Sequence, residues 1–138
     1  MTELVKIMLV EDNPGDRELT RMGMARLKFA NELVMAEDGE EALEMLEDPD
    51  ISRPDLILLD LNMPGMDGME FLTRIKAHAV HKTIPVIVLT SSGAPDDIDG
   101  AYRRHCAGYI RKPGDMEGLA KIVDAIDGYW FAIVELPR

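Results

Sequence analysis

The chain has 138 residues, a formal net charge of -11 at pH 7 and 46% hydrophobic residues. A chain of this length can bury one hydrophobic core, so we expect a single domain over residues 1–138. The excess of acidic residues argues against binding to nucleic acid or to an anionic membrane surface, because both need clustered Lys and Arg. Cys106 is the only cysteine, which excludes a disulfide framework and a multi-cysteine metal site.

No apolar run in the sequence approaches the roughly 20 residues of a membrane-spanning helix. The start of the chain lacks the basic region and the long apolar region of a signal peptide. These observations predict a protein without membrane contact and with a cytoplasmic location.

Short apolar runs alternate along the chain with segments whose apolar residues recur at helical spacing. The apolar runs predict five strands, at residues 5–10, within 31–36, at 56–59, at 85–89 and at 107–110. The helical spacing predicts five helices, over 16–29, over 40–46, from after Gly68 to about Ala77, from Pro95 onward, and from Asp115 to Ile133. Such an alternation with short connections is typical of a parallel five-stranded sheet with helices on both faces.

The central run, Leu56 to Leu59, is continuously apolar, as expected of a strand buried on both faces. Asp60 follows this strand directly, and a turn cluster that ends at Gly68 comes next. The strand therefore carries one carboxylate to the rim of the sheet, where ligands bind in open α/β folds. A solvated Asp at a strand end is the structural alternative.

Polar residues also end the other predicted strands that form this rim. They are Glu11 and Asp12 after the first strand, Thr90 at the fourth and Lys112 after the fifth. Three carboxylates at one edge repel one another, which raises a pKa or recruits a cation such as Mg²⁺. A divalent ion, an ammonium and a hydroxyl around a carboxylate suit phosphoryl transfer. Asp60 is therefore the expected nucleophile, forming an acyl phosphate.

These residues, in their sequence context, resemble the receiver domain of two-component response regulators. The matching motifs are Glu11-Asp12, Asp60 within LLDLNMPGMDG, Thr90 within VIVLTSS and Lys112-Pro113 after GYIR. The resemblance implies a flavodoxin-like three-layer α/β sandwich with strand order 2-1-3-4-5. It also implies a phosphorylation-activated switch that accepts a phosphoryl group on Asp60 from a sensor histidine kinase.

The same resemblance assigns a metal site. Mg²⁺ or Mn²⁺ would be held by Asp12, Asp60 and the backbone carbonyl of Asn62, with Glu11 acting through water. Thr90 would bind the phosphoryl oxygens together with the ammonium group of the lysine after the fifth strand.

The resemblance further implies a switch and a means of setting the phosphoryl lifetime. Thr90 would move toward the phosphate while Tyr109 rotates inward. Asn62 and Ser92 would tune the lifetime of the phosphoryl group. The Lys112–Pro113 bond is often cis in this family, and an X-Pro bond can adopt that form.

The end of the chain resembles stand-alone receivers paired with bacterial phytochrome-type histidine kinases. Tyr129, Trp130 and Phe131 are consecutive aromatics on the extended last helix, and three consecutive positions cannot all face one core. At least one aromatic must be exposed or covered by a partner, so we expect these residues to form a homodimer interface. A downstream protein or phosphotransfer partner would read the switch.

Two other functions fit parts of the pattern. A phosphohydrolase of the haloacid dehalogenase type also uses a strand-end Asp, but it needs a second Asp where this chain has Asn62. A degenerate receiver would act only as an interaction module, and the intact Asp60 argues against it. We expect His78, His81 and His105 to be surface or satisfied residues, because they show no ligand spacing with one another or with Cys106.

Overall fold

The computed structural model describes residues 5–25, 31–63, 65–131 and 134–137, without the side chain of Phe131. Five parallel strands form one sheet in the order β2-β1-β3-β4-β5, as predicted. The strands are β1 (Val5–Val10), β2 (Asn31–Ala36), β3 (Leu56–Leu59), β4 (Val86–Thr90) and β5 (Gly108–Arg111). The helices are α1 (Pro14–Met24), α2 (Gly39–Glu47), α3 (Gly68–Ala77), α4 (Pro95–Arg103) and α5 (Met116–Ile126). This is the predicted flavodoxin-like α/β fold.

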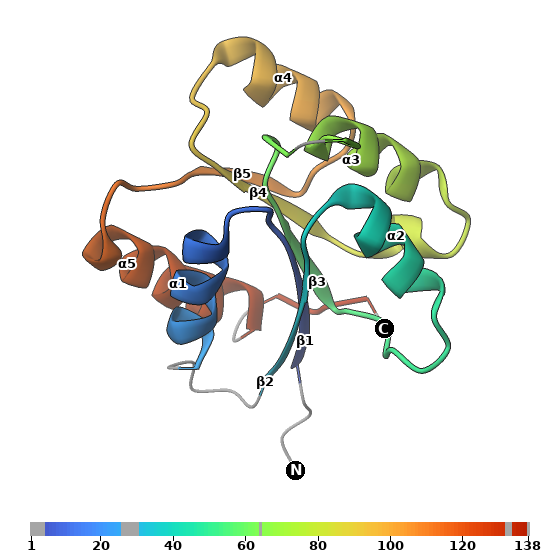
Figure 1. Ribbon diagram of the computed structural model, residues 1–138, viewed down its shortest axis with the longest axis horizontal. Helices are drawn as coiled ribbons and strands as arrows, with labels where there is room; N and C mark the ends of the chain where they lie inside the picture. The colour runs from blue at the N-terminus through green and yellow to red at the C-terminus, as the bar shows by residue number, and fades with distance from the viewer. Residues whose placement is uncertain (1–4, 26–30, 64, 132–133, 138) are drawn as a thin grey trace.

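The sheet is the middle of three layers. Helices α1 and α5 lie on one side of it, and α2, α3 and α4 lie on the other (Figure 1). Alternate residues of a strand point to opposite faces, so Ile7 and Leu9 pack under α1 and α5, whereas Met8 and Val10 pack under α2 and α3. All four residues of β3 are buried, which explains why the central run is continuously apolar. No helix in the described parts of the chain is long and apolar enough to cross a membrane.

Helix α1 begins two residues earlier than predicted and ends at Met24. The side chain of Asn13 caps it by accepting a hydrogen bond from the backbone N–H of Asp16 at 3.0 Å. Pro14 stands at the first helical position, where its missing N–H costs nothing. The Asn-Pro pair is a helix-start signal, which the predicted start at residue 16 did not use. Residues 26–30, which include the predicted end of this helix, lie outside the described residues.

The last helix is a shorter α-helix than predicted. Helix α5 ends at Ile126, and a π-helical segment, η2 (Asp127–Phe131), follows it. The backbone N–H of Val134 donates to the carbonyl of Tyr129 at 2.9 Å, a bond that spans five residues. Asp127 and Gly128 have low helix propensity, consistent with a change of helix type here. The predicted end at Ile133 lies outside the described residues.

Helix α4 starts differently from the other α-helices. Asn or Asp side chains cap α1, α2, α3 and α5, but the cap position of α4 is Ala94, which makes no side-chain cap bond. An N-cap side chain is worth about 0.5–2 kcal/mol, so the first turn of α4 lacks that stabilisation. A short 3-10 helix, η1 (His81–Thr83), which the sequence did not predict, precedes β4.

The connection between β3 and α3 packs tightly against the end of β3. A Cβ atom at Gly68 would lie 2.4 Å from the carbonyl oxygen of Asp60 and 2.5 Å from the Cα of Leu61. The N–H of Gly68 donates to the carbonyl of Leu61 at 3.1 Å. Glycine at this position therefore lets α3 begin in direct contact with the backbone that carries Asp60.

Candidate phosphoryl-acceptor site

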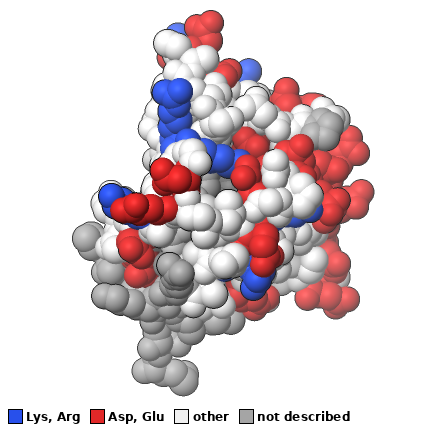
Figure 2. All heavy atoms as spheres, turned by 60° about the vertical axis from the view of Figure 1, so that its left-hand side comes forward, with Lys and Arg blue, Asp and Glu red and all other residues white. Residues whose placement is uncertain are grey.

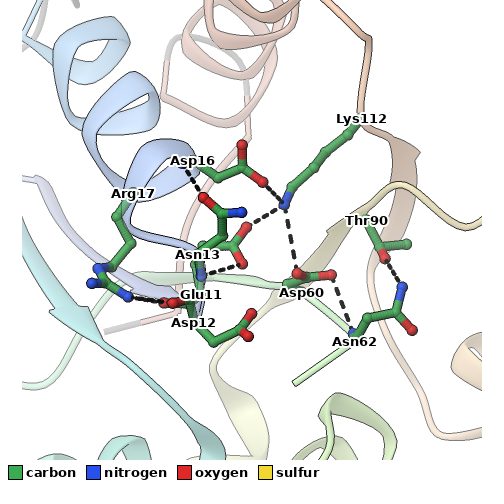
Figure 3. A network of polar contacts seen from close by, with 9 residues as sticks. All are labelled: Glu11, Asp12, Asn13, Asp16, Arg17, Asp60, Asn62, Thr90 and Lys112. Carbon is green, nitrogen blue, oxygen red and sulfur yellow. Dashed lines mark hydrogen bonds and ion pairs between the residues drawn. The ribbon is translucent and has the colours of Figure 1, made fainter. Parts of the chain in front are cut away.

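The parallel sheet brings the predicted site residues to one rim (Figure 3). Glu11 and Asp12 directly follow β1, Asp60 follows β3, Thr90 is the last residue of β4, and Lys112 follows β5. Residues up to about one hundred positions apart in sequence thus come within contact distance. The site residues come from the strand ends because all five strands run the same way.

Three carboxylates form an acidic cluster at this rim: Glu11, Asp12 and Asp60. Their ligand oxygens lie within 4.8 Å of one another. Glu11 is 2% exposed and Asp60 is 7% exposed, so these charges are screened little by water. Oxygen ligands from carboxylates and carbonyls are those that Mg²⁺ and Mn²⁺ prefer. The donor set therefore fits a divalent ion of this kind.

Glu11 responds strongly to this crowding. Burial raises the pKa of Glu11, and the adjacent Asp60 carboxyl raises it further, to about 7, against the lowering effect of Lys112. Near neutral pH the protonated and ionised forms of Glu11 are therefore both populated. A divalent cation bound between the carboxylates would favour their charged forms, so it would lower the pKa of Glu11.

Lys112 is the cation of the site. Its ammonium contacts Glu11 Oε1, lies 2.8 Å from Asp16 Oδ2 and lies 3.5 Å from Asp60 Oδ2. Burial lowers the pKa of Lys112, but the hydrogen bonds to Asp16 and Glu11 outweigh it and raise the pKa above its usual range. Lys112 therefore stays charged, next to the predicted nucleophile.

On the other side of Asp60, Asn62 links the nucleophile to Thr90. The backbone N–H of Asn62 donates to Asp60 Oδ1 at 3.3 Å, and its side-chain amide donates to Thr90 Oγ1 at 3.4 Å. Thr90 is fully buried. Its carbonyl accepts a hydrogen bond from the backbone N–H of Lys112 at 2.7 Å, which joins the ends of β4 and β5.

Tyr109 and Ser92, the predicted switch and lifetime residues, lie around the β4–α4 loop. The Tyr109 hydroxyl donates to the backbone carbonyl of Ser92 at 2.8 Å, and the ring packs against the core under α4. The Ser92 hydroxyl donates to Asp97 in the first turn of α4 and accepts from the N–H of Ala94 at 3.3 Å. Ser92 therefore bonds within its own loop rather than to Asp60.

The Lys112–Pro113 bond is trans, because the described residues contain no cis peptide bond. The cis form implied by family resemblance is therefore wrong for this structure. The trans form is the lower-energy isomer of X-Pro bonds by about 0.5–1 kcal/mol. With the Lys112–Pro113 bond trans, the Lys112 ammonium contacts Glu11 in the acidic cluster.

Arg17 was missed by the sequence reasoning. Its guanidinium Nη1 donates to the backbone carbonyls of Glu11 and Asp12, each at 2.9 Å. It also forms an ion pair with Glu37 at 3.6 Å. Arg17 thus fixes the loop that presents the acidic pair. A lone Arg in a helix carries no motif that would have revealed this role.

The aromatic segment near the end of the chain divides between the core and the surface. Tyr129 is 55% exposed, whereas Trp130 packs against the core under α1 and α5. Their rings meet edge-on, with centroids 5.6 Å apart. The prediction that at least one aromatic is exposed or covered by a partner is confirmed for Tyr129, while the side chain of Phe131 lies outside the described residues.

Two histidines lie closer together than expected. His78 and His81 stack at 4.0 Å, and their Nε2 atoms lie 3.1 and 3.2 Å from Glu47 Oε1, close enough for a metal ion. The prediction that the histidines lack ligand spacing is therefore wrong for this pair. However, His78 Nδ1 accepts the N–H groups of Val80 and His81, which puts the proton of a neutral His78 on Nε2, facing Glu47. These bonds account for the orientation of the His78 ring, which joins the end of α3 to the start of η1.

Charge on the surface is unevenly distributed. Figure 2 shows acidic side chains gathered along one side of the face in view, with basic side chains in fewer, separate groups.

Known proteins resemble this chain over nearly its whole length. Residues 7–124 match the family model of the response regulator receiver domain. The response regulator Rcp1 of Synechocystis sp. is 38% identical over 135 residues, which cover 95% of this chain and 92% of Rcp1. These matches extend across all five strands and all five α-helices.

Solved structures agree. The phosphorylated cyanobacterial phytochrome response regulator RcpA has a TM-score of 0.94 and 41% identity, covering 99% of this chain and 100% of that chain. The Mn²⁺-bound form of Rcp1 has a TM-score of 0.90 and 38% identity, covering 97% of this chain and 99% of that chain. The fold, the polar rim and these similarities agree: the chain belongs to the response regulator receiver family of two-component signalling.

Proposed function

We propose that this receiver takes up a phosphoryl group on Asp60 from a phosphohistidine of a sensor histidine kinase. The observation that carries the proposal is the position of Asp60, at the end of the buried central strand, 3.5 Å from the Lys112 ammonium and inside the acidic cluster. A buried carboxylate in such a setting is costly unless its charge is used.

In the proposed reaction a carboxylate oxygen of Asp60 attacks the phosphorus, the P–N bond to histidine breaks, and the imidazole leaves. Lys112 and Thr90 would bind the phosphoryl oxygens, and Asp12, Asp60 and the carbonyl of Asn62 would hold Mg²⁺ or Mn²⁺, with Glu11 behind them. When bound, the ion would neutralise part of the negative charge on the phosphoryl oxygens. Arg17 keeps the acidic loop in place through its carbonyl bonds.

The partner is proposed to be a phytochrome-type histidine kinase in the cytoplasm, on the basis of similarity to RcpA and Rcp1. A downstream protein or a phosphotransfer partner would then recognise the phosphorylated surface. The receiver would act as a switch and not as a turnover enzyme. The phosphohydrolase alternative lacks support, because the position of its general acid holds an amide, Asn62, that is bonded to Thr90.

We also propose that the phosphoryl group changes the face made by α4, β5 and α5. Thr90 would follow the phosphoryl oxygens, and Tyr109 would respond through its bond to the carbonyl of Ser92 in the same loop. The start of α4 at Ala94 lacks a side-chain cap, which supports a change at this end of the helix. Asn62 and Ser92 remain the residues expected to set the phosphoryl lifetime.

The exposed ring of Tyr129 supports a homodimer on the same face. An exposed aromatic is a favoured interface anchor, and homo-oligomers usually form two-fold, self-complementary contacts. Trp130 would support the contact, because its ring meets that of Tyr129 and also packs against the core. Phe131 is also proposed to belong to this interface, and for this residue the proposal rests only on the sequence.

The first prediction concerns the acceptor. With acetyl phosphate and Mg²⁺, the parent should take up one hydroxylamine-labile phosphoryl group, and Asp60→Asn should lose it, because the amide cannot form the acyl phosphate. Intact-mass spectrometry measures the gain. Asp50→Asn, in an exposed loop, is the control and should label like the parent. Undiminished labelling of Asp60→Asn would sink the assignment.

The second prediction concerns pH and metal. An acid whose folded pKa is raised contributes stability that is present below its ordinary pKa, 4.5 for Glu11, and is lost as pH rises through about 7. Without metal, the free energy of unfolding should therefore fall by up to about 3 kcal/mol between acid and mildly alkaline pH. Urea titrations with and without Mg²⁺ measure this, and Mg²⁺ should reverse the loss.

Variants distinguish the roles of Glu11 and Asp12 in metal binding. Glu11→Gln should flatten the pH dependence and weaken Mg²⁺ binding by about 10–100-fold at most, as expected for a residue behind the metal ligands. Asp12→Asn should weaken Mg²⁺ binding more, since it removes a direct carboxylate ligand. Equal, small effects of both variants on Mg²⁺ affinity would show that the ligand assignment is wrong.

The third prediction concerns the switch. Thr90→Ala should still be labelled at Asp60 but should lose the change in backbone amide chemical shifts of α4 and β5 on adding beryllofluoride, since the moving hydroxyl is gone. Ser52→Ala, which removes a hydroxyl from an exposed loop before β3, is the control and should respond like the parent. The proposed route fails if Thr90→Ala and the parent respond identically.

The fourth prediction concerns the dimer. Sedimentation at micromolar concentration should show a dimer that tightens with salt, because salt screens repulsion between chains of charge -11. Tyr129→Ala should shift the protein toward monomer, and Val80→Ala, which removes another exposed apolar side chain, should not. A strict monomer with and without beryllofluoride would leave the dimer without support.

A further inference from the structure

Asp16 binds the same ammonium group that the proposed reaction needs. Lys112 Nζ lies 2.8 Å from Asp16 Oδ2 but 3.5 Å from Asp60 Oδ2, so the lysine is closer to the first turn of α1 than to the nucleophile. Figure 3 shows the lysine side chain reaching between these two carboxylates. In the described structure the Lys112 ammonium is thus paired more closely with Asp16 than with Asp60.

The start of α1 leaves the carboxylate of Asp16 free for this contact. An acidic residue at the third helical position often reaches back to the N–H of the cap residue. Here the N–H of the cap residue, Asn13, is instead directed to Glu11 Oε2 at 3.3 Å. The Asn13 side chain accepts from the N–H of Asp16 and fixes its backbone. The carboxylate of Asp16 is therefore positioned but not used for capping.

We propose that Asp16 is a positioning residue that holds Lys112 in a resting arrangement and competes for it with the phosphoryl group on Asp60. This inference rests on the proposed function of Asp60. On phosphorylation, Lys112 would leave Asp16 and bind a phosphoryl oxygen, while the three protons of its ammonium still allow contact with Glu11.

The position of Asp16 suits such an exchange. The Asp16 side chain is 39% exposed, whereas those of Glu11 and Asp60 are 2% and 9% exposed. When the lysine leaves, water can solvate the Asp16 carboxylate, so releasing Lys112 costs little there. Losing a contact at a buried carboxylate would cost more. Asp16 is therefore the partner that Lys112 gives up.

The test is the affinity for beryllofluoride at saturating Mg²⁺. Asp16→Asn should tighten binding by about threefold to tenfold, the range expected when a partly exposed ion pair no longer competes. Asp16→Glu keeps a carboxylate near the lysine and should stay within about twofold of the parent. Glu18→Gln, which removes an exposed charge of the same helix paired with Arg21, is the control and should leave the affinity unchanged.

A second measurement separates contact with Lys112 from a general charge effect. Asp16→Asn should speed the initial rate of labelling by acetyl phosphate in the parent, and it should not change the labelling rate in a Lys112→Met background. An equal gain in both backgrounds, or unchanged beryllofluoride affinity of Asp16→Asn, overturns the inference. A parent that neither binds beryllofluoride nor labels at Asp60 overturns the proposed function as well.

Discussion

Electrostatic repulsion at the rim of the sheet is the constraint on which the site depends. Parallel strands deliver Glu11, Asp12 and Asp60 to one place, with two of these residues nearly inaccessible to water. The protein offsets this repulsion in two ways without a metal ion. Lys112 brings one positive charge, and the pKa of Glu11 rises to about 7 because of burial and the nearby Asp60. A divalent cation held by the three carboxylates would offset the same repulsion, which fits the donor set of the site.

The sequence predicted the sheet well because buried parallel strands leave a strong pattern. The run at Leu56–Leu59 was correct at both ends, since an apolar strand between a Pro-containing loop and an Asp allows few alternatives. The helix ends were harder. The Asn13-Pro14 start of α1 depends on one side-chain bond. The π-helical turn after Ile126 depends on backbone bonding that the low helix propensity of Asp127 and Gly128 does not by itself specify.

The chemistry of the site could be predicted from residue types, but its pairings could not. The motifs identified Asp60, Thr90 and Lys112 as neighbours, because strand ends meet at one edge. They did not reveal that Lys112 bonds to Asp16, or that Arg17 holds the carbonyls of the acidic loop. Such contacts depend on side-chain reach across elements. The stacking of His78 on His81 was not predicted for a related reason. It depends on the bond from the Val80 N–H to His78 Nδ1 and on the 3-10 turn that begins at His81.

The glycine at the start of α3 leaves the backbone of Asp60 no room to move toward that helix. The backbone of Asp60 is clamped on both sides: its N–H donates to the carbonyl of Val10 at 3.0 Å, and its carbonyl lies against Gly68 with no room even for a methyl group. A phosphoryl group on Asp60, as proposed above, would therefore not be accommodated by retreat of the strand that carries it. The displacement would pass instead to the loop beyond Thr90, which leads into α4, the α-helix that starts without a side-chain cap.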